Sequence, residues 1–340
     1  MENRREFLKS TGAVSVVGLT ALSGCMGGDG SGSDGTTEDD STTSGDGTTS
    51  GGDTTTQSEM DFQNGEVNMN VSPSVAQESL QAQYKPIKNH LSDKLGLPAT
   101  MQLANDYSAV IEALSSGTSD VAETGPFAAA LGVKSDKAEI ILQRKGYGSW
   151  TYKSLIAVPK DSDISKLSDL KGKTVAFADR LSASGALYPL YNLKTEGGLS
   201  VGNLPEGAGG DADFEPNFTG GHEKSYAALK AGQVDAAGFG GFIPGIAEDY
   251  EANAKTIHTQ EGLPRAPIVV SPQLSDKEKQ AITDAFTGAP DKIYYGEDGE
   301  KGTDDDLWFN AVREAGVDQY QGVIDVANEL GVGQDIFKDK

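Results

Sequence analysis

The chain has 340 residues with 51 acidic and 28 basic side chains, so its formal net charge at pH 7 is −23. This negative charge argues against binding to nucleic acids or anionic lipid surfaces, because both would be repelled. The single cysteine, Cys25, excludes an intramolecular disulfide and a thiolate metal site. We interpret most of the acidic excess as solvated surface of the kind found in halophilic proteins, where salt screens the repulsion.

Residues 1–25 have the features of an export signal. Arg4 and Arg5 form a twin-arginine pattern, a short apolar segment follows at residues 10–22, and the sequence LSGC ends it. The apolar segment falls short of the roughly 20 residues that a membrane-spanning helix needs. The LSGC sequence resembles a lipobox, which implies cleavage before Cys25 and attachment of lipid to its thiol. We therefore expect export in the folded state and anchoring to the outer face of the cell membrane.

Residues 26–64 follow the signal and consist largely of Gly, Ser, Thr, Asp and Glu. Such a segment cannot bury enough apolar surface to offset the chain entropy lost on folding. We therefore expect a disordered acidic linker here. The chain from residue 65 onward is long enough for two lobes with separate cores.

From residue 65, patterns typical of strands alternate with patterns typical of helices. The first half predicts strands at 66–73, 99–104, 119–126 and 152–160, and helices at 79–96, 106–117 and 127–135. The second half predicts strands at 173–179, 233–239 and 265–272, and helices at 222–232, 275–288, around 304–315 and at 319–330.

The alternation predicts an α/β protein with two lobes, each built on a mostly parallel central sheet. We assign residues 65–155 and 262–340 to the first lobe and residues 156–261 to the second. Two crossing strands, near 152–160 and 262–272, are expected to join them. The cleft between such lobes is the expected ligand site.

Four loops share one design: each follows a strand-like segment and precedes a helix-like one. They are DYS at 106–108, TGP at 124–126, SASG at 182–185 and GGHE at 220–223. The first N–H groups of a helix are unpaired and its dipole is positive there, so a helix start attracts anions. Each loop taken singly is more often only a helix cap. Four of them in one chain favour an anion-binding cleft.

His222 is one of three histidines and stands directly behind Gly220 and Gly221. Its neutral ring can donate a hydrogen bond to an anionic oxygen, and near pH 6.5 it can add positive charge. The alternative is a histidine that only caps the helix or packs against it. The two glycines favour the ligand role, because they permit close approach of the backbone to a ligand.

Catalytic patterns are weak in this chain. It contains no GxxxxGK[ST], HExxH or GxSxG sequence. His90 and His258 have no partners at metal-ligand spacing, so we expect neither a metal nor a cofactor. A triad of Ser182, His222 and Asp235 can be written down, but the spacing gives it no support.

Taken together, the segments resemble the phosphate-, phosphite- and phosphonate-binding components of ABC importers, a PhnD-like family with a type II periplasmic-binding-protein fold. The resemblance runs through YKPIKNHLSDKLG, DYSAVIEAL, DVAETGP, SASG, FTGGHEKSYAALKAGQVDAA and LPRAPIVVSP, in family order across most of residues 66–272. It implies contacts to a phosphorus oxyanion from side chains and from backbone donors. The implied ligand-binding residues are Tyr107, Thr124, Gly125, Tyr152, Ser182, Ala183, Ser184 and His222.

Three departures from the family pattern narrow the expected ligand. Ala183 stands where the family has a hydroxyl, so one donor is lost or replaced. The stretch GFGGFIPG at 238–245 lacks the carboxylate with which aminoalkylphosphonate binders of the family hold the ligand amine, and Ala266 replaces the family's Asp. An ammonium group would stay unpaired in such a site. We expect phosphate, phosphite or a small simple phosphonate, while Arg265 either approaches the anion or faces solvent.

The sequence thus predicts a lipid-anchored, monomeric, extracytoplasmic receptor that is not an enzyme. It would close its two lobes on the anion and deliver it to the permease and ATPase subunits of an importer. Three alternatives stay open: a receptor for a sulfonate or carboxylate, a secreted phosphoester hydrolase using Ser182 and His222, and a sensor module. Phosphate and phosphite are not ranked, since they differ by one hydroxyl replaced by hydrogen.

Overall fold

The computed structural model describes residues 62, 65–73 and 77–337. The export signal, Cys25 and the predicted linker apart from Phe62 lie outside these residues, so those predictions stay predictions. Phe62 itself is buried and packs in a core of the first sheet. Within the described residues, no helix combines the length and apolar character that crossing a membrane requires.

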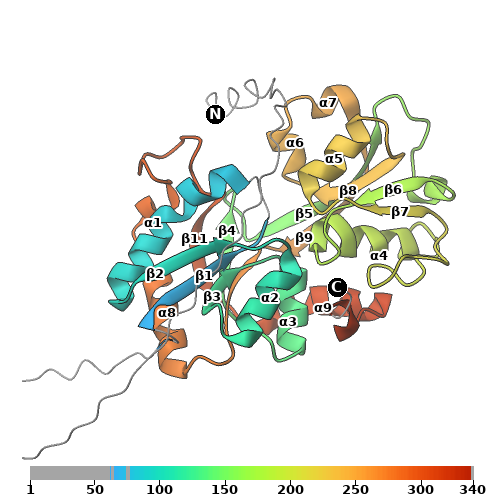
Figure 1. Cartoon of the computed structure of the whole chain (residues 1–340). Helices are drawn as coiled ribbons and strands as arrows, with labels where there is room; N and C mark the ends of the chain where they lie inside the picture. The colour runs from blue at the N-terminus through green and yellow to red at the C-terminus, as the bar shows by residue number, and fades with distance from the viewer. Residues whose placement is uncertain (1–61, 63–64, 74–76, 338–340) are drawn as a thin grey trace, which may run out of the picture. The chain divides into compact units, whose positions relative to one another are not determined.

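The first sheet has six strands in the order β11-β4-β10-β3-β1-β2 (Figure 1). Its strands are β1 (Val67–Val71), β2 (Ala99–Leu103), β3 (Val121–Glu123), β4 (Glu139–Gly146), β10 (Pro267–Val270) and β11 (Phe309–Glu314). Helices α1 (Gln77–Leu95) and α8 (Asp276–Thr287) share one core with this sheet, and α2 (Tyr107–Ser116) and α3 (Pro126–Lys134) share another. Alternate residues of β10 serve the two cores, because strand side chains point to opposite faces.

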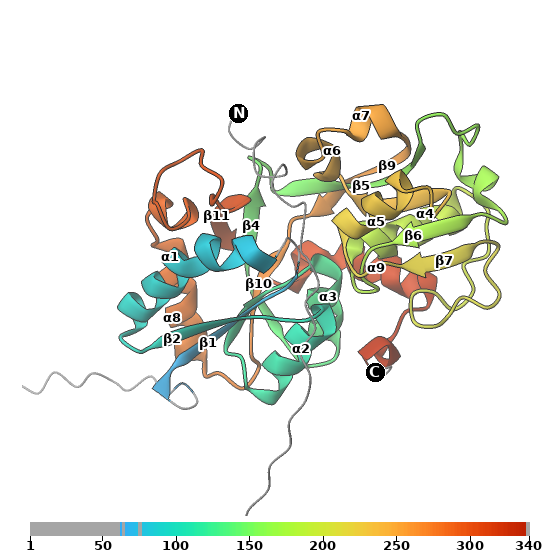
Figure 2. The same ribbon diagram turned by 45° about the horizontal axis from the view of Figure 1, so that its top comes forward.

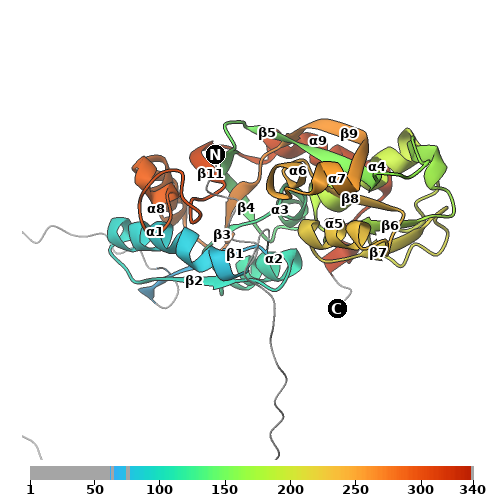
Figure 3. The ribbon, with the colours of Figure 1, turned by 90° about the horizontal axis from the view of Figure 1, so that it is seen from above.

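The second sheet has five strands in the order β7-β6-β8-β5-β9. Its strands are β5 (Thr151–Pro159), β6 (Thr174–Phe177), β7 (Glu215–Phe218), β8 (Ala236–Gly240) and β9 (Ala254–Pro264). One face packs on α4 (Tyr188–Thr195) and the other on α5 (His222–Lys230), with the short helices α6 (Ile243–Ile246) and α7 (Tyr250–Asn253) beside α5 (Figure 3). Each sheet is therefore covered by helices on both faces.

Both sheets are mixed, which corrects the prediction of mostly parallel sheets. Strand β1 is parallel to β2 and β3, and β6 is parallel to β7 and β8, whereas the pairs made by β10, by β11 and by β5 are antiparallel. Parallel pairing needs a crossover connection between the strands. Strands β5, β9 and β10 lie next to the two passages between the sheets. Strand β5 is antiparallel to β8 and β9, and β10 is antiparallel to β3 and β4.

The chain passes between the sheets twice (Figure 2). Residues 147–150 lead from β4 to β5, and residues 265–266 lead from β9 to β10. The N–H of Arg265 donates to the carbonyl of Trp150 over 3.0 Å, so the two passages are hydrogen-bonded to each other. The predicted strand at 152–160 is confirmed as β5 of the second sheet, whereas the predicted strand at 262–272 spans the end of β9, the crossing itself and β10 of the first sheet. The crossings are the short segments 147–150 and 265–266.

The predicted helix around 304–315 is wrong, because residues 309–314 form strand β11. Phe309 is buried and its ring lies against Tyr84 and Tyr294, with centroids 6.3 and 5.4 Å apart. Pairing with β4 also covers an otherwise open sheet edge. Strands β4 and β7, and β9 up to residue 261, were not predicted, whereas the helix at 319–330 is confirmed as α9 (Gln321–Leu330).

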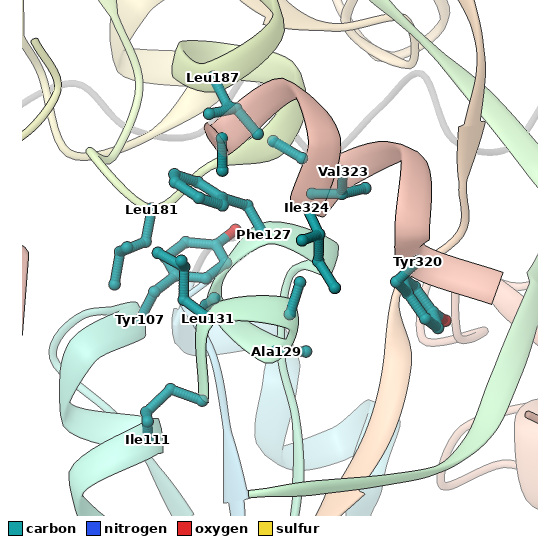
Figure 4. Close-up of a cluster of buried hydrophobic side chains, with 14 of the residues drawn as sticks. Tyr107, Ile111, Phe127, Ala129, Leu131, Leu181, Leu187, Tyr320, Val323 and Ile324 are labelled. Carbon is teal, nitrogen blue, oxygen red and sulfur yellow. The ribbon is translucent and has the colours of Figure 1, made fainter. Parts of the chain in front are cut away.

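One hydrophobic cluster combines side chains from helices of both sheets (Figure 4). Tyr107 and Phe127 come from α2 and α3, and Leu187 comes from the turn Ala183–Leu187 that leads into α4. Val323 and Ile324 of α9 pack on the same cluster. The cluster fixes the starts of α2, α3 and α4 close to one another, which positions the site described next.

Candidate functional site

A cavity of about 80 Å³ lies among the loops at the starts of these helices. All eight residues predicted to bind ligand line it, together with eight others. The lining residues are Ser72, Tyr107, Thr124, Gly125, Pro126, Arg144, Tyr147, Tyr152, Ser182, Ala183, Ser184, His222, Phe242, Arg265, Ala266 and Trp308. A cavity of this volume holds several water-sized groups. The structure therefore gathers the predicted residues, although their contact with a ligand stays a prediction.

The four helix starts differ in how their N–H groups are satisfied. Asp106 accepts a hydrogen bond from the N–H of Ala109 at the start of α2, and Ser182 Oγ accepts one from Gly185 over 3.0 Å. These two residues cap their helices, as the alternative interpretation held. Gly125 and Gly221, which precede α3 and α5, make no side-chain cap. The residues Ala183–Leu187 form a π-helical turn, a feature frequent at functional sites.

The imidazole of His222 is held in one tautomer. Its Nδ1 accepts the N–H of Gly240 over 3.0 Å, so the proton of the neutral ring is on Nε2. Nε2 lies 3.3 Å from Ser182 Oγ and donates its proton to that oxygen. A Cβ on Gly185 would come within 2.9 Å of the imidazole Cε1, which explains the glycine there.

The charge of His222 differs from the prediction. The side chain is only 8% exposed, and burial lowers its pKa from 6.5 to about 4. The ring is therefore neutral near pH 6.5 and acts as a hydrogen-bond donor without adding charge. Phe242 packs edge-on against it, with ring centroids 5.1 Å apart, and contributes to the apolar surroundings.

The geometry argues against a Ser182–His222–Asp235 triad. A triad histidine donates from Nδ1 to the acid and accepts the serine proton at Nε2. Here Nδ1 accepts from a backbone N–H and Nε2 carries the proton. Asp235 accepts a hydrogen bond from the N–H of Thr174, the first residue of β6. Within the described part of the chain, no group of three or more His, Cys, Asp or Glu side chains is placed to hold a metal.

Several hydroxyl groups of the cavity are available as donors. Burial raises the pKa of Tyr152 to about 12, partly opposed by its hydrogen bond to Ser184, and burial also raises the pKa of Tyr107. Both phenols therefore stay protonated at neutral pH. Thr124 is fully buried, and its Oγ1 has no hydrogen-bond partner. Buried polar groups are normally paired, so this hydroxyl marks a place where a ligand atom fits.

Arg144 lines the cavity but its charge is already paired. It forms an ion pair with Glu123, and both side chains are 1% exposed. Ser72 donates to Glu123 over 3.1 Å, and Arg144 Nε donates to the carbonyl of Ala266 over 3.2 Å. Sequence reasoning missed this pair. The signal was Glu123 itself, an acid at the end of an apolar strand, which requires a buried cation as partner.

Arg265 also lines the cavity, and its charge is unpaired. Its guanidinium carbon lies 5.3 Å from the ring centre of Tyr152, 5.4 Å from that of Tyr147 and 5.9 Å from that of Trp308. The residue is 9% exposed, Nε has no hydrogen-bond partner, and no carboxylate among the described residues forms an ion pair with it. Of the two roles left open by the sequence, the solvent-facing one is therefore wrong.

Two α/β sheets joined by two short passages, with a buried polar cavity at converging helix starts, define a type II periplasmic-binding protein. Comparison of the sequence with protein families gives the particular one. Residues 69–320 match the family described as the periplasmic substrate-binding protein of phosphonate ABC transporters. The match covers well over half of the chain, so this protein belongs to that family, whose members serve transport rather than catalysis.

Curated relatives agree with this assignment. The chain is 33% identical to the phosphate-import protein PhnD of Mycolicibacterium smegmatis over 169 residues, which are 48% of this chain and 51% of the relative. It is 28% identical to the phosphonates-binding periplasmic protein of Escherichia coli over 229 residues, 65% of either chain. The chain thus spans about half to two thirds of the relatives it matches.

Solved structures show the same fold. A binding component of a phosphonate ABC transporter from Pseudomonas aeruginosa has a TM-score of 0.61 at 23% identity, covering 78% of this chain and 86% of its own. PhnD1 of Prochlorococcus marinus, solved in complex with methylphosphonate, has a TM-score of 0.62 at 16% identity, covering 78% and 98%. At these identities the likeness concerns the fold.

Proposed function

We propose that this protein is the solute-binding component of an ABC importer and that it captures a phosphorus oxyanion: phosphate, phosphite or a small phosphonate. One observation carries the proposal. Among the described residues that line the cavity there are two guanidinium groups and an unpartnered buried hydroxyl, on Thr124, but no acidic side chain. An anion supplies the acceptors and the negative charge that this lining lacks.

The predicted binding residues then act as donors. The oxygen of Ser182 accepts bonds from Gly185 and His222, so its own proton is free to turn toward the ligand. Tyr107 and Tyr152 donate from protonated phenols, and the unpartnered Thr124 hydroxyl donates beside them. Backbone N–H groups near Thr124, Gly125 and Ser184 complete the set. Ala183 contributes no hydroxyl.

Ligand capture follows from the two passages between the sheets. Residues 147–150 and 265–266 are short and join two lobes, so rotation about them opens and closes the cavity. A ligand that contacts both lobes favours the closed form, which the permease and ATPase subunits receive. Because the protonated Nε2 of His222 cannot serve as a general base toward Ser182, we propose capture and release without chemical change.

The attachment of the protein to the membrane forms part of the same proposal. Cys25 and residues 1–25 support a lipid-anchored monomer on the outer face of the cell membrane, with residues 26–64 as its tether. A change of Cys25→Ala is expected to release the protein into the medium. Mass spectrometry should detect lipid on Cys25 of the wild-type protein and no lipid on the variant.

Calorimetry in molar salt tests the ligand assignment. Phosphate, phosphite, methylphosphonate, aminoethylphosphonate, ethanesulfonate and sulfate are titrated into the protein. We expect at least one of the first three to bind most tightly. Best binding of sulfate or the sulfonate, or no binding at all, contradicts the phosphorus assignment. Turnover of a phosphoester under the same conditions contradicts the receptor role.

A His222→Ala change tests the binding site. We expect affinity for the preferred anion to fall by about 1–3 kcal/mol, because Ser182 Oγ loses the Nε2–H donor that leaves its own proton free to bind the anion. His258→Ala is the matched control, because His258 lies beside Glu196 outside the cavity. Equal affinities of the two variants would show that His222 only packs against the helix start.

A further inference from the structure

The cavity contains two buried guanidinium groups with different surroundings. Arg144 has Glu123 as its partner, so the protein itself neutralises this charge. Arg265 lies against aromatic rings and, in the part of the chain that the structure describes, forms no ion pair with a carboxylate, although it is about nine-tenths buried. Burying an unpaired charge is unfavourable, and an anionic group in the cavity removes this penalty. Arg265 is therefore the buried cation whose charge a bound anion would neutralise.

The position of Arg265 differs from that of the hydroxyl donors. Ser182, Ser184 and His222 belong to the helix starts of the second sheet, and Ser184 is hydrogen-bonded to the Tyr152 hydroxyl. Arg265 lies instead against the ring face of Tyr152, 5.3 Å from its centre. The Tyr152 hydroxyl thus faces the helix-start donors, whereas its ring faces Arg265. The cavity has a place for a head group and a separate place for a substituent.

We propose that Arg265 is the specificity-determining residue of the substituent subsite and that the site selects phosphonates bearing a carboxylate. This inference rests on the proposed function. A guanidinium pairs with a carboxylate through two parallel hydrogen bonds, which fixes both its charge and its orientation. An alkyl substituent of the same size leaves Arg265 unpaired, and an ammonium group is repelled. Trp308 and Tyr147 flank Arg265 and limit where the carboxylate can lie.

Three ligands of similar size test the proposal: phosphonoacetate, propylphosphonate and 2-aminoethylphosphonate. Titration of the protein, followed by calorimetry or by tryptophan fluorescence, is expected to give affinities in that order. Arg265→Gln should weaken phosphonoacetate by about 10- to 100-fold, the effect of losing one close charge pair in a partly buried site. The same change should alter methylphosphonate binding by less than about 3-fold, since that ligand lacks the substituent.

Two controls separate charge selection from other effects. Lys153 follows Tyr152 in the sequence, and its exposed side chain pairs with Glu261. Lys153→Gln therefore removes a positive charge near the site without touching Arg265, and it should leave the order of affinities unchanged. Arg265→Gln should fold, because the hydrogen bonds of Arg265 with Tyr320 and Trp150 are made by its backbone, which the change leaves in place. Arg265→Lys should retain the rejection of 2-aminoethylphosphonate, since it retains the charge.

The outcomes are distinguishable. Equal weakening of phosphonoacetate and methylphosphonate by Arg265→Gln places the guanidinium on the phosphorus head group and overturns the proposal. An unchanged order of affinities in Arg265→Gln, or an equal effect of Lys153→Gln, overturns it as well. Failure of the wild-type protein to bind any phosphorus ligand overturns the proposed function and this inference together, whereas the other results leave the proposed function in place.

Discussion

The two guanidinium groups of the cavity show how one buried charge serves folding while another serves binding. Arg144 lies between the rings of Trp308 and Phe309, 4.5 and 4.9 Å from their centres, and pairs with Glu123. Arg265 has similar aromatic neighbours, including the same Trp308, but no acid. Both guanidinium groups thus contact aromatic rings, but only that of Arg144 pairs with a carboxylate among the described residues.

This difference separates stability from affinity. A cation with a partner in the protein contributes to folding, because removing the partner leaves a buried charge. A cation or hydroxyl without such a partner contributes less to folding, because its replacement breaks no ion pair or hydrogen bond; Arg265 loses only its contacts with aromatic rings. Such a group contributes when a ligand arrives. We therefore expect substitutions at the Arg144 pair to lower stability and substitutions at Arg265 to lower ligand affinity. Each experiment below tests one side of this contrast.

The largest effect is expected for Glu123→Gln. This change keeps the shape of the side chain but leaves Arg144 without a counter-charge, at a cost of roughly 3–5 kcal/mol in the free energy of unfolding. Chemical denaturation followed by circular dichroism measures it. Glu261→Gln, which breaks an exposed pair with Lys153, is the control and should have almost no effect. A stability loss below 1 kcal/mol for Glu123→Gln would put both arginines in the same class.

His222 gives the next largest effect, through pH. Its pKa is lowered to about 4 in the folded state from an ordinary 6.5, so the unfolded chain binds the proton first as the pH falls. Stability is then lost between about pH 6.5 and pH 4, by about 3 kcal/mol in total. His222→Gln should remove this part of the pH dependence. Superimposable pH profiles of the two proteins would contradict the neutral, buried imidazole.

Particular residues show where sequence reasoning succeeded. The eight residues that the family resemblance implied line one cavity. Seven of them lie in loops at helix starts, a pattern that is local and visible in the sequence, whereas Tyr152 lies in strand β5. The pairing of Arg144 with Glu123 joins strands β4 and β3, which lie on either side of β10 in a sheet whose order no local pattern gives. Strand β11 was not predicted for the same reason, since its partner β4 lies far away in sequence.

The tautomer of His222 illustrates a further limit. The two glycines before it predicted closeness to a ligand, but its charge depends on Gly240, which donates to Nδ1 from another strand. Burial by Phe242 likewise arises from packing. Residue type and spacing indicated which side chains meet, whereas the protonation states and charges followed from tertiary contacts.

Thr124 offers a smaller test on the unpartnered side of the contrast. Thr124→Val keeps the shape and removes the hydroxyl, which has no partner in the protein. Stability should stay equal or rise slightly, since no hydrogen bond is broken and an unsatisfied polar group is removed. Ligand affinity should fall by about 0.5–1.5 kcal/mol, the net value of one hydrogen bond. Thermal denaturation and calorimetry on the same samples distinguish this result from a general loss of structure.

The smallest effect is expected for the stability of Arg265→Gln without ligand. No ion pair breaks, and the backbone bonds from Tyr320 to Arg265 and from Arg265 to Trp150 remain, so the free energy of unfolding should change by less than about 1 kcal/mol. A saturating ligand stabilises a protein in proportion to its affinity, so the variant should gain less from phosphonoacetate than the wild type does. Denaturation with and without that ligand measures both quantities. A large loss in the unliganded protein would mean that Arg265, like Arg144, is needed for folding.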